Sequence, residues 1–451
     1  AFGATDVRFR LLMGKTDTAI LDFLVFANQP LQTPDPDQLS DTLTALVSPL
    51  VQTLRDALRA QEVDEAGVDR LTVLYGAALP PAYALHIEPR HLVEDTRSLD
   101  AVAASGQMVA RLRQDDRDAA AGHIRLLVYS AVDIALSHVL AFHQLQVATV
   151  LIYGSPQQQR AWLRRTTDEN GWWGNALNPR DTRLQALPNK AAAPGYELNG
   201  IKGFCSGTRG SHYLTVSARV EGHSQPVLGL LETASAGIAV KDDWNPMGQR
   251  QTDSGSVQFS QVHLPASAVM RDETAGTSAF HTLRNCLAQL VLVNLFVGVA
   301  QGARQQARDY ALQHAKPWMG STVERATDDP YLLRRMGEMQ AQISAAALMA
   351  DHAAALLQKA WLRGENLVTS ERAEVAIAVF EAKVMAHRCT LFATQEMFDV
   401  VGSRGTHADL GFDRFWRNVR THTLHDPLDY KLQALGRWAV YGEEPSAVNY
   451  N

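Results

Sequence analysis

The chain has 451 residues, enough for two or three domains with separate cores. Hydrophobic residues make up 46% and charged residues 20%, which is ordinary for a soluble globular protein. The formal net charge of -6, without any Lys/Arg run, leaves no basic surface for nucleic acid. We therefore exclude a nucleic-acid partner.

The three cysteines, Cys205, Cys286 and Cys389, are widely spaced and form no Cys-x-x-Cys pair. This spacing argues against a zinc ribbon or a disulfide scaffold and is typical of a protein from a reducing compartment. The N-terminal residues lack the charged start, apolar core and small-residue cleavage site of a secretory signal. We therefore expect a cytoplasmic protein.

Residues 1–170 predict a helical domain, with residues 1–50 as an extension to which no role is assigned. Prolines between residues 30 and 36 separate an opening helix from a second helix over residues 41–58, DTLTALVSPLVQTLRDAL. A longer apolar helix is predicted over residues 119–145. On this helix His138 and Phe142 share one side and His143 lies beside them. The pattern alone also allows core histidines with local hydrogen bonds.

Residues 171–270 predict a small β-domain. The aromatic, non-periodic GWWGNALNPRD leads to YELNGIKGFCSG, where Asn199-Gly200 predicts a two-residue hairpin turn. Further β-type runs follow: HYLTVSARV, PVLGLLE and GSVQFSQVHLP. No glycine-rich phosphate loop opens a helix, so neither a Rossmann site nor a P-loop is predicted.

Residues 271–451 predict a helical bundle. Residues 287–300, LAQLVLVNLFVGVA, are apolar nearly all round and too short to span a bilayer. We expect them to form the buried centre of the bundle, and we expect no membrane partner. Between residues 374 and 400 a 4-3-4-3-4 spacing predicts a helix-packing seam, formed by Phe380, Val384, His387, Leu391, Thr394 and Phe398. His387 is expected to be a core histidine satisfied by hydrogen bonds.

Residues 411–430, GFDRFWRNVRTHTLHDPLDY, place His422 and His425 three residues apart, directly before Asp426. The aromatic and arginine-rich surroundings favour a functional site. The spacing alone equally allows two histidines on a helix face that are satisfied by hydrogen bonds. A metal on the pair is a further alternative, but there is no helical His-Glu-x-x-His arrangement and no evident third ligand.

The order of helical domain, β-domain and bundle resembles the acyl-CoA dehydrogenase superfamily from about residue 50 to the end. The general motifs are WGNA at 173–176, MGQRQTDSGS at 247–256 and GSRGTH at 402–407. SHVLAFH, GFCSG, DDWNPMGQRQTDSGS, KPW, ATDDPY and FWRNVRTHTLHDP resemble one branch more closely, the reduced-flavin monooxygenases that include the dibenzothiophene monooxygenases. The implied fold is mainly α with a β-domain insert: an N-terminal helical domain, a middle β-barrel or sandwich, and a C-terminal four-helix bundle.

A dehydrogenase of this superfamily needs a carboxylate base that removes a proton next to a thioester carbonyl. Matching the start of the family's segment to Arg417 puts His425 and Asp426 at its Tyr-Glu pair, so the carboxylate is one methylene shorter. In a second subgroup the base lies on the first bundle helix, where this chain has Ala288. The resemblance therefore disfavours dehydrogenation.

The monooxygenase branch implies that reduced flavin reacts with oxygen to form a C4a-hydroperoxide, which must be shielded and hydrogen-bonded. An imidazole, which titrates near neutral pH, can exchange a proton with that group. The resemblance assigns this acid–base role to His425, with His422 beside it. It implies that Ser206 and Asn175 are the hydrogen-bonding partners over the flavin.

The resemblance also implies that His138, Phe142 and His143 line the substrate pocket. The dibenzothiophene enzymes have Tyr at the position of Phe142, so one hydroxyl contact is absent and a different substrate is expected. Four residues of the 247–256 motif are expected to be structural or to line the flavin rim: Arg250, Thr252, Asp253 and Ser254.

The flavin type is inferred from the cations available for a phosphate. The dehydrogenases hold the adenylate half of FAD with an Arg and a Phe-Gly pair, whereas the region after the first bundle helix here reads HAKPWMGS. Lys316 and Arg404 resemble basic positions of the monooxygenase branch and suit a terminal phosphate, although surface salt bridges are the alternative. Trp244 is implied to wall the isoalloxazine, with core packing as its alternative. FMN is therefore expected rather than FAD.

The sequence thus predicts a two-component monooxygenase, in which a separate flavin reductase supplies reduced FMN because the chain has no nicotinamide site. The expected substrates are O2 and a small hydrophobic molecule, aromatic or heterocyclic, that is oxidised at sulfur, nitrogen or carbon. The resemblance implies a homotetramer with the bundles at its centre, in which residues 402–407 complete a neighbour's flavin site. Two alternatives stay open: an acyl-CoA dehydrogenase or oxidase that uses Asp426 as base, and a non-catalytic flavin-fold assembly protein.

Overall fold

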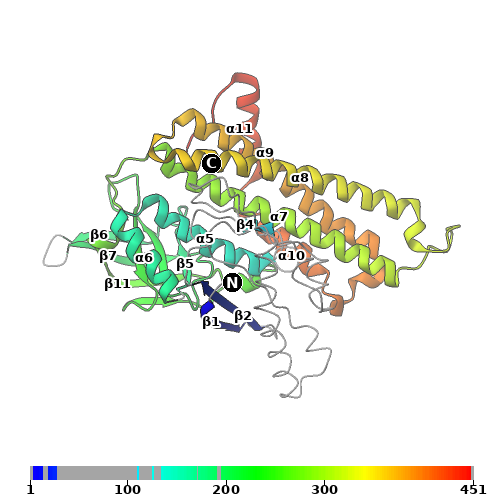
Figure 1. The fold of residues 1–451 in the computed structure, drawn as a ribbon, viewed down its shortest axis with the longest axis horizontal. Coiled ribbons are helices and arrows are strands. Elements are labelled where there is room, and N and C mark those ends of the chain that lie inside the picture. The colour runs from blue at the N-terminus through cyan, green and yellow to red at the C-terminus, as the bar shows by residue number, and fades with distance from the viewer. Residues whose placement is uncertain are drawn as a thin grey trace, which may run out of the picture.

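The structure is a computed structural model of the chain. It describes residues 4–13, 19–27, 109–110, 124–125, 134–169, 171–189 and 194–447, the first four of these ranges by their backbone alone. Along these residues, helices α5 and α6 precede strands β5 to β12, and helices α7 to α11 follow. The strands of the β-domain gather at one end of the molecule, and the long helices extend to the other (Figure 1). The expected order of helical segment, β-domain and helical bundle is confirmed.

The N-terminal residues form a hairpin of two antiparallel strands, β1 (Ala4–Met13) and β2 (Ala19–Ala27). The expected opening helix is therefore wrong. In β1 the apolar Val7 and Phe9 alternate with Arg8 and Arg10, and this period of two is typical of a strand with two different faces. The helix expected over residues 41–58 lies outside the described residues.

The apolar helix expected from residue 119 begins later. Strand β3 (Val109–Ala110) pairs with β4 (Ile124–Arg125), and α5 spans Ile134–Tyr153. A second helix, α6 (Pro156–Asp168), follows after a turn at Ser155, whose side chain accepts a hydrogen bond from the Gln158 amide. α5 packs against α7 of the bundle on one side and against β5 on the other, so it joins the two cores.

The β-domain consists of two four-stranded sheets. One has the order β10 (Ile238–Val240), β11 (Val257–Pro265), β7 (Gly195–Lys202) and β6 (Gln185–Asn189). The other has the order β12 (Val269–Arg271), β9 (Val227–Glu232), β8 (Tyr213–Ala218) and β5 (Trp173–Ala176). β5 pairs with β8 in parallel, and the remaining pairs within the two sheets are antiparallel. Large buried side chains such as Trp173, Tyr213 and Phe259 fill the core of this domain.

Asn199-Gly200 does not form the expected hairpin turn, because both residues lie inside β7. Opposite them β11 carries a bulge, where the Gln261 amide donates a hydrogen bond of 2.8 Å to Asn199 Oδ1. A Cβ at Gly200 would lie 2.1 Å from the Arg183 carbonyl oxygen. The glycine is thus required for a close approach of two backbone segments, and the side chain of Asn199 caps a bulge.

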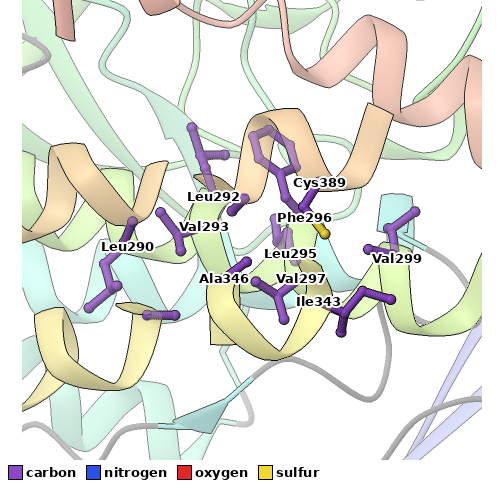
Figure 2. Packing of buried hydrophobic residues seen from close by; sticks show 14 of the residues in the cluster. Leu290, Leu292, Val293, Leu295, Phe296, Val297, Val299, Ile343, Ala346 and Cys389 are labelled. Atoms are coloured by element: carbon purple, nitrogen blue, oxygen red, sulfur yellow. The ribbon is translucent and has the colours of Figure 1, made fainter. Parts of the chain in front are cut away.

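The bundle is built from the long helices α7 (Ala279–His314), α8 (Pro330–Arg363) and α9 (Thr369–Val401). The shorter α10 (Asp413–His422) and α11 (Leu428–Tyr441) pack against α9. The apolar segment of α7 lies at the centre as expected, with Leu292 and Phe296 at most 1% exposed. Figure 2 shows these α7 side chains packing with Ile343 of α8 and Cys389 of α9.

The expected packing seam of α9 is buried at Phe380, Val384 and Thr394. His387 on this seam differs from expectation, since its Nδ1 atom has no hydrogen-bond partner among the described residues. Burial, together with the nearby Lys383 and Arg420, lowers the pKa of His387 to about 4. It is thus a neutral imidazole whose hydrogen bonds are incomplete.

Helices α5 and α7 are long and apolar enough to cross a membrane by length and composition alone, with mean hydropathy of 1.4 and 1.7 in their most apolar windows. Those windows are 56% and 72% buried inside the protein. A core helix of a globular domain has the same composition. The two helices therefore carry no argument for a membrane span.

Candidate functional site

Three residues from distant parts of the chain form one buried hydrogen-bonded chain. His138 Nδ1 lies 3.0 Å from His422 Nε2, and His138 Nε2 lies 2.9 Å from the Ser206 hydroxyl. Each of the three residues is at most 6% exposed. His138 comes from α5, Ser206 from the loop between β7 and β8, and His422 from the last turn of α10. The chain therefore spans the interface between the β-domain and the bundle.

Both imidazoles of this chain are neutral. Burial lowers the pKa of His138 to about 3, with a further contribution from His425. Burial and the neighbouring His138 lower the pKa of His422 well below its usual value. A neutral imidazole has one donor and one acceptor nitrogen. Either every proton points toward Ser206 or every proton points away from it, so the two imidazoles orient the Ser206 hydroxyl without a buried charge. At the other end, His422 Nδ1 has no hydrogen-bond partner among the described residues.

The hydrogen-bonded chain continues beyond Ser206. Its hydroxyl lies 2.8 Å from the Ser254 hydroxyl, which lies 2.7 Å from that of Thr252. Thr252 donates to the Gln249 carbonyl at 2.8 Å, and the Gln249 amide donates to Asn418 Oδ1 at 2.6 Å. Since Asn418 lies one turn before His422 on α10, the chain returns to the helix from which it started.

Gly248 allows the 247–256 loop to approach α10. A Cβ at this position would lie 2.0 Å from the carbonyl oxygen of Arg417, which is a backbone atom with little freedom to move. The Arg417 guanidinium donates to the Met247 carbonyl at 2.9 Å and so holds the same contact from the other side. Two of the motifs quoted above, MGQRQTDSGS and FWRN, are thus parts of one contact.

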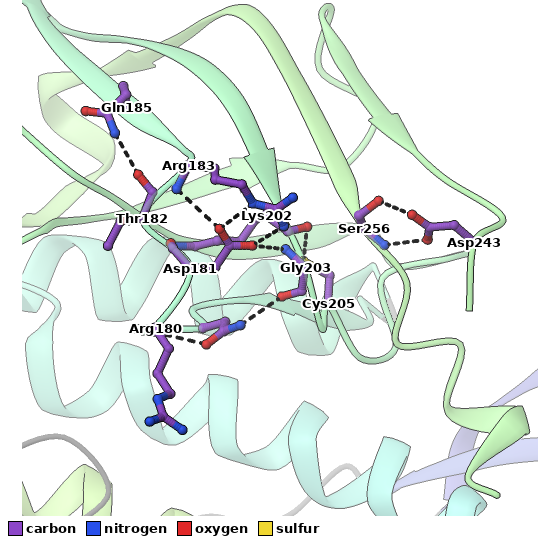
Figure 3. A network of polar contacts seen from close by, with 11 residues as sticks. Arg180, Asp181, Thr182, Arg183, Gln185, Lys202, Gly203, Cys205, Asp243 and Ser256 are labelled. Atoms are coloured by element: carbon purple, nitrogen blue, oxygen red, sulfur yellow. Dashed lines mark hydrogen bonds and ion pairs between the residues drawn. The ribbon is translucent and has the colours of Figure 1, made fainter. Parts of the chain in front are cut away.

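A second polar network holds the loop that carries Ser206 (Figure 3). The Gly203 amide donates to Asp181 Oδ2 at 2.7 Å, and the buried Lys202 ammonium donates to the Asp181 carbonyl at 2.7 Å. The Arg183 guanidinium lowers the pKa of Asp181 to about 2, so this carboxylate stays ionised. The Cys205 amide donates to the Gly255 carbonyl at 2.9 Å. Ser206 therefore stands on a loop with little freedom.

Asn175 and Phe142 lie beside the hydrogen-bonded chain, next to Ser206 and His138 respectively. The backbone amide of Asn175, in β5, donates to the Ser206 carbonyl at 3.2 Å. The side-chain oxygen of Asn175 accepts from the backbone amide of Leu177 at 3.2 Å. Phe142 stacks on His138 with ring centroids 3.9 Å apart. The Asn175 side-chain oxygen is therefore engaged locally, and Phe142 supplies an apolar lid on one face of the His138 ring.

His425 lies just after α10 and differs from His422 in its surroundings. Its side chain is 32% exposed, and its Nδ1 lies 3.1 Å from Asp426 Oδ1. Burial alone would raise the pKa of Asp426, but Lys383, the hydrogen bond with His425, and Lys431 hold it well below its usual range. An ionised carboxylate that is so weakly basic is a poor proton acceptor for carbon acids. Asp426 is thus a hydrogen-bonding partner of His425.

His143 faces away from this group. Its ring stacks on Trp172 with centroids 4.4 Å apart, and its Nδ1 accepts a hydrogen bond from the Trp173 amide at 3.1 Å. It anchors the entry to β5 and does not contact His138 or Ser206 through any of these groups. Its assignment to the substrate pocket remains a prediction.

Trp244 lies next to an exposed aromatic ring. Its indole donates to the Gln249 carbonyl at 2.8 Å, and the Phe204 ring meets it edge to face with centroids 5.8 Å apart. Phe204 has a left-handed backbone with φ of 58° and is 65% exposed, although the adjacent Cys205 and Ser206 are buried. Such a conformation is uncommon for a bulky residue and is concentrated at functional sites.

Lys316 and Arg404 are both exposed, and they follow the C-terminal ends of α7 and α9. Phe296, which meets the His422 ring at 5.4 Å, is 18 residues before the end of α7 at His314, a length of roughly 27 Å in a helix. Lys316 follows that end, and Arg404 follows the end of α9 near Phe412, whose ring meets Tyr310. In one chain neither cation reaches Ser206.

The site contains several residues that the sequence does not predict. Ser254 and Thr252 were expected to be structural or rim residues, but their buried hydroxyls extend the chain from Ser206. Lys383 and Lys431 were not singled out, and both lie against Asp426. One signal was available: Lys383 stands in the otherwise apolar run AKVMA of α9, where a buried cation requires a partner.

Comparisons with known proteins agree with this geometry. Residues 290–430 match the family model described as acyl-CoA dehydrogenase, C-terminal domain. The chain is 39% identical over 324 residues to the probable FMNH2-dependent monooxygenase SfnC of Pseudomonas putida, which covers 72% of this chain and 81% of that protein.

Two solved structures are similar in fold and sequence. Methanesulfinate monooxygenase MsuC from Pseudomonas fluorescens is 40% identical, with a TM-score of 0.70 over 72% of this chain and 85% of that chain. FMN-bound TdsC, a dibenzothiophene monooxygenase from Paenibacillus sp. A11-2, is 33% identical, with a TM-score of 0.69 over 72% and 84%. The chain therefore belongs to the acyl-CoA dehydrogenase superfamily and is a flavin-dependent monooxygenase of the branch that contains dibenzothiophene monooxygenase.

Proposed function

We propose that this monooxygenase uses reduced FMN, delivered by a separate flavin reductase, and O2 to oxygenate a small hydrophobic substrate. The observation that carries the proposal is the buried chain from His422 through His138 to the Ser206 hydroxyl. Neutral imidazoles and hydroxyls can donate or accept a proton at Ser206 without introducing a charge next to a reactive group. His425, which is partly exposed, is the group that exchanges protons with solvent.

The residues around Ser206 fit a flat aromatic cofactor. Phe204 is 65% exposed and held in a left-handed conformation beside Trp244, and a ring that covers both would remove apolar surface from water. Ser206, Asn175 and Trp244 would hold this ring. Reduced FMN, when bound, supplies the two electrons with which one atom of O2 enters the substrate and the other leaves as water.

We also propose that the phosphate of FMN is bound by Lys316 and Arg404 of a second copy of the chain. The support is that both cations are exposed and follow the ends of α7 and α9, and that roughly 27 Å of α7 separates its end from Phe296, which lies beside His422. A homotetramer in the cytoplasm, with the bundles at its centre, would bring the end of one bundle to the β-domain of another. The exposed Leu333, Leu348 and Leu362 of α8 supply apolar surface for such packing.

The oxidised atom is proposed to be sulfur in a small aromatic, heterocyclic or alkyl compound. Similar proteins are named for dibenzothiophene and for methanesulfinate, both of which are sulfur compounds. In this chain the ring next to His138 is Phe142, stacked at 3.9 Å, so this wall of the site offers no hydroxyl to a polar substrate. Nitrogen and carbon oxidation remain the competing outcomes of the experiment.

The test is product analysis under ¹⁸O2 with anaerobically reduced FMN and a panel of dibenzothiophene, indole and methanesulfinate. One ¹⁸O atom in the product of a single compound supports the proposal and identifies the oxidised element. Hydrogen peroxide equal to the FMN oxidised, with no labelled product from any compound, contradicts it. Anaerobic bleaching of bound oxidised flavin by an acyl-CoA would instead establish a dehydrogenase, a reaction that the ion pairs of Asp426 disfavour.

A further inference from the structure

Asp426 is surrounded by three basic side chains from three parts of the fold. Lys383 Nζ of α9 lies 3.5 Å from its Oδ1, and Lys431 Nζ of α11 lies 3.6 Å from its Oδ2. The third partner is His425, whose Nδ1 lies 3.1 Å from Oδ1. The carboxylate is 4% exposed and each lysine is 2% exposed. Two buried ammonium groups thus face one buried carboxylate.

We infer that Asp426 is a positioning residue for His425, and that Lys383 and Lys431 hold its carboxylate in the orientation that receives the His425 Nδ1 proton. This inference rests on the proposed function, in which His425 exchanges protons with solvent. The geometry supports it because the contact with His425 is the shortest of the three that the carboxylate makes to basic side chains. Nε2 is then the ring nitrogen on the side opposite Asp426.

A purely structural role explains this cluster less well. Replacing a buried ion pair by apolar side chains is often neutral or stabilising, so fold stability alone does not call for such a group. This cluster also has two lysines for one carboxylate. Burial lowers the pKa of Lys383 to about 8, although Asp426 opposes that shift. The carboxylate does have one partner that is partly exposed and can change its charge, which is His425 at 32% exposure.

Other charged or titratable groups face the same region. α9 contributes His387 and Arg388, α10 contributes Arg420 and His422, and α5 contributes His138. Burial keeps the pKa values of His138, His387 and His422 low, so these three remain uncharged near neutral pH. Asp426 and the two lysines, which contact one another, therefore supply charges of opposite sign beside His425.

This balance predicts shifts of opposite sign. Asp426→Asn keeps the shape of the side chain but removes the charge that stabilises the His425 imidazolium, so His425 should lose its proton at lower pH. Lys383→Met removes a competing cation and leaves Asp426 paired with His425 and Lys431, so His425 should lose its proton at higher pH. A variant that merely loosens the fold has no reason to produce both signs.

The experiment is acylation of flavin-free protein by diethyl pyrocarbonate, which reacts with neutral imidazole, followed by peptide mass spectrometry at pH 5 to 9. We expect the midpoint of the His425 labelling curve to fall by about 1 to 2 pH units in Asp426→Asn and to rise by about half a unit in Lys383→Met. Asp429→Asn and Lys359→Met, which change exposed charges on α11 and α8, should leave the midpoint unchanged.

Asp426→Asn removes the carboxylate that faces both lysines, and this loss of opposite charge weakens the fold. The double variant with Lys383→Met restores the charge balance, and its His425 midpoint should stay below that of the unmodified protein while its near-ultraviolet circular dichroism recovers. An unchanged midpoint in Asp426→Asn, or a shift of the same sign in both single variants, would overturn the inference. The labelling needs no flavin, so it stands or falls separately from ¹⁸O incorporation.

Discussion

His138 Nε2 lies 2.9 Å from the Ser206 hydroxyl, although the two residues are 68 positions apart and belong to different domains. His138 is carried by a helix that packs on the bundle, and Ser206 by a loop that is fixed through Asp181 and Gly203. The hydrogen bond therefore depends on how α5 sits between the two cores. Residues that hold this interface should affect the chemistry as much as those within it.

Ser206→Ala should lower the oxygenation rate by about 100-fold, because it removes the hydroxyl that joins His138 to Ser254 in the hydrogen-bonded chain. The loss should be in the turnover rate, since a hydroxyl contributes little to binding of an apolar substrate. Ser211→Ala is the matched control, because the Ser211 hydroxyl bonds to Thr208 and Thr233, which are not part of the hydrogen-bonded chain through Ser206. Equal rates for Ser206→Ala and Ser211→Ala would exclude this role.

The free energy of unfolding should fall as the pH drops from 6.5 to 4.5. An unfolded histidine binds a proton near pH 6.5, whereas burial lowers the pKa of His138 to about 3 in the folded protein. Between these values the unfolded chain binds more protons, so acid favours unfolding by about 1.4 kcal/mol per pH unit for each such residue. Stability is fully present above pH 6.5 and is lost progressively toward the folded pKa.

Denaturant titrations at several pH values measure this slope. We expect His138→Gln to reduce the slope of the unfolding free energy against pH by the contribution of one histidine, about 1.4 kcal/mol per pH unit. Glutamine can accept and donate hydrogen bonds without titrating. His223→Gln serves as the control, since His223 is exposed. Exposed carboxylates contribute only below about pH 4, outside the range used. A slope that is the same in His138→Gln as in the unmodified protein would contradict a neutral buried His138.

Gly248→Ala should separate the 247–256 loop from α10. Its Cβ would lie 2.0 Å from the Arg417 carbonyl oxygen, so the hydrogen bond between the Gln249 amide and Asn418 has to lengthen or break. We expect a loss of about 1 to 3 kcal/mol in the free energy of unfolding, together with lower activity. Gly276→Ala is the control, because no atom lies within 4 Å of a Cβ at Gly276.

Lys316→Met and Arg404→Met should each weaken FMN binding by about 10- to 100-fold, the value of one charged hydrogen bond to a phosphate. Binding of riboflavin, which lacks the phosphate, should be unchanged. Arg334→Met, which changes an exposed cation on α8, is the control. If the cations come from a second copy, FMN binding should also weaken on dilution to monomers. Equal losses for FMN and riboflavin would argue against phosphate contacts.

Local rules succeeded where one short segment decides the structure. The apolar run of α7 was predicted as the bundle centre, and Leu292 and Phe296 are buried there because no face of that segment is polar. They failed where a distant strand decides. Asn199-Gly200 has the composition of a hairpin turn, yet it lies within β7, because the bulge of β11 and the approach of Arg183 require those two residues.

The sequence by itself determined the family, the β-domain followed by a helical bundle, and candidate residue types for the site, because motifs and periodicity are properties of short segments. Only the tertiary structure decided which partners His422 and His425 have. His422 joins His138, which is 284 positions away, and His425 joins Asp426 between two lysines from different helices. The two histidines are three residues apart and identical in type. The end of α10 turns the His422 ring into the core, where burial lowers its pKa and keeps it uncharged, and leaves the His425 ring partly exposed beside Asp426.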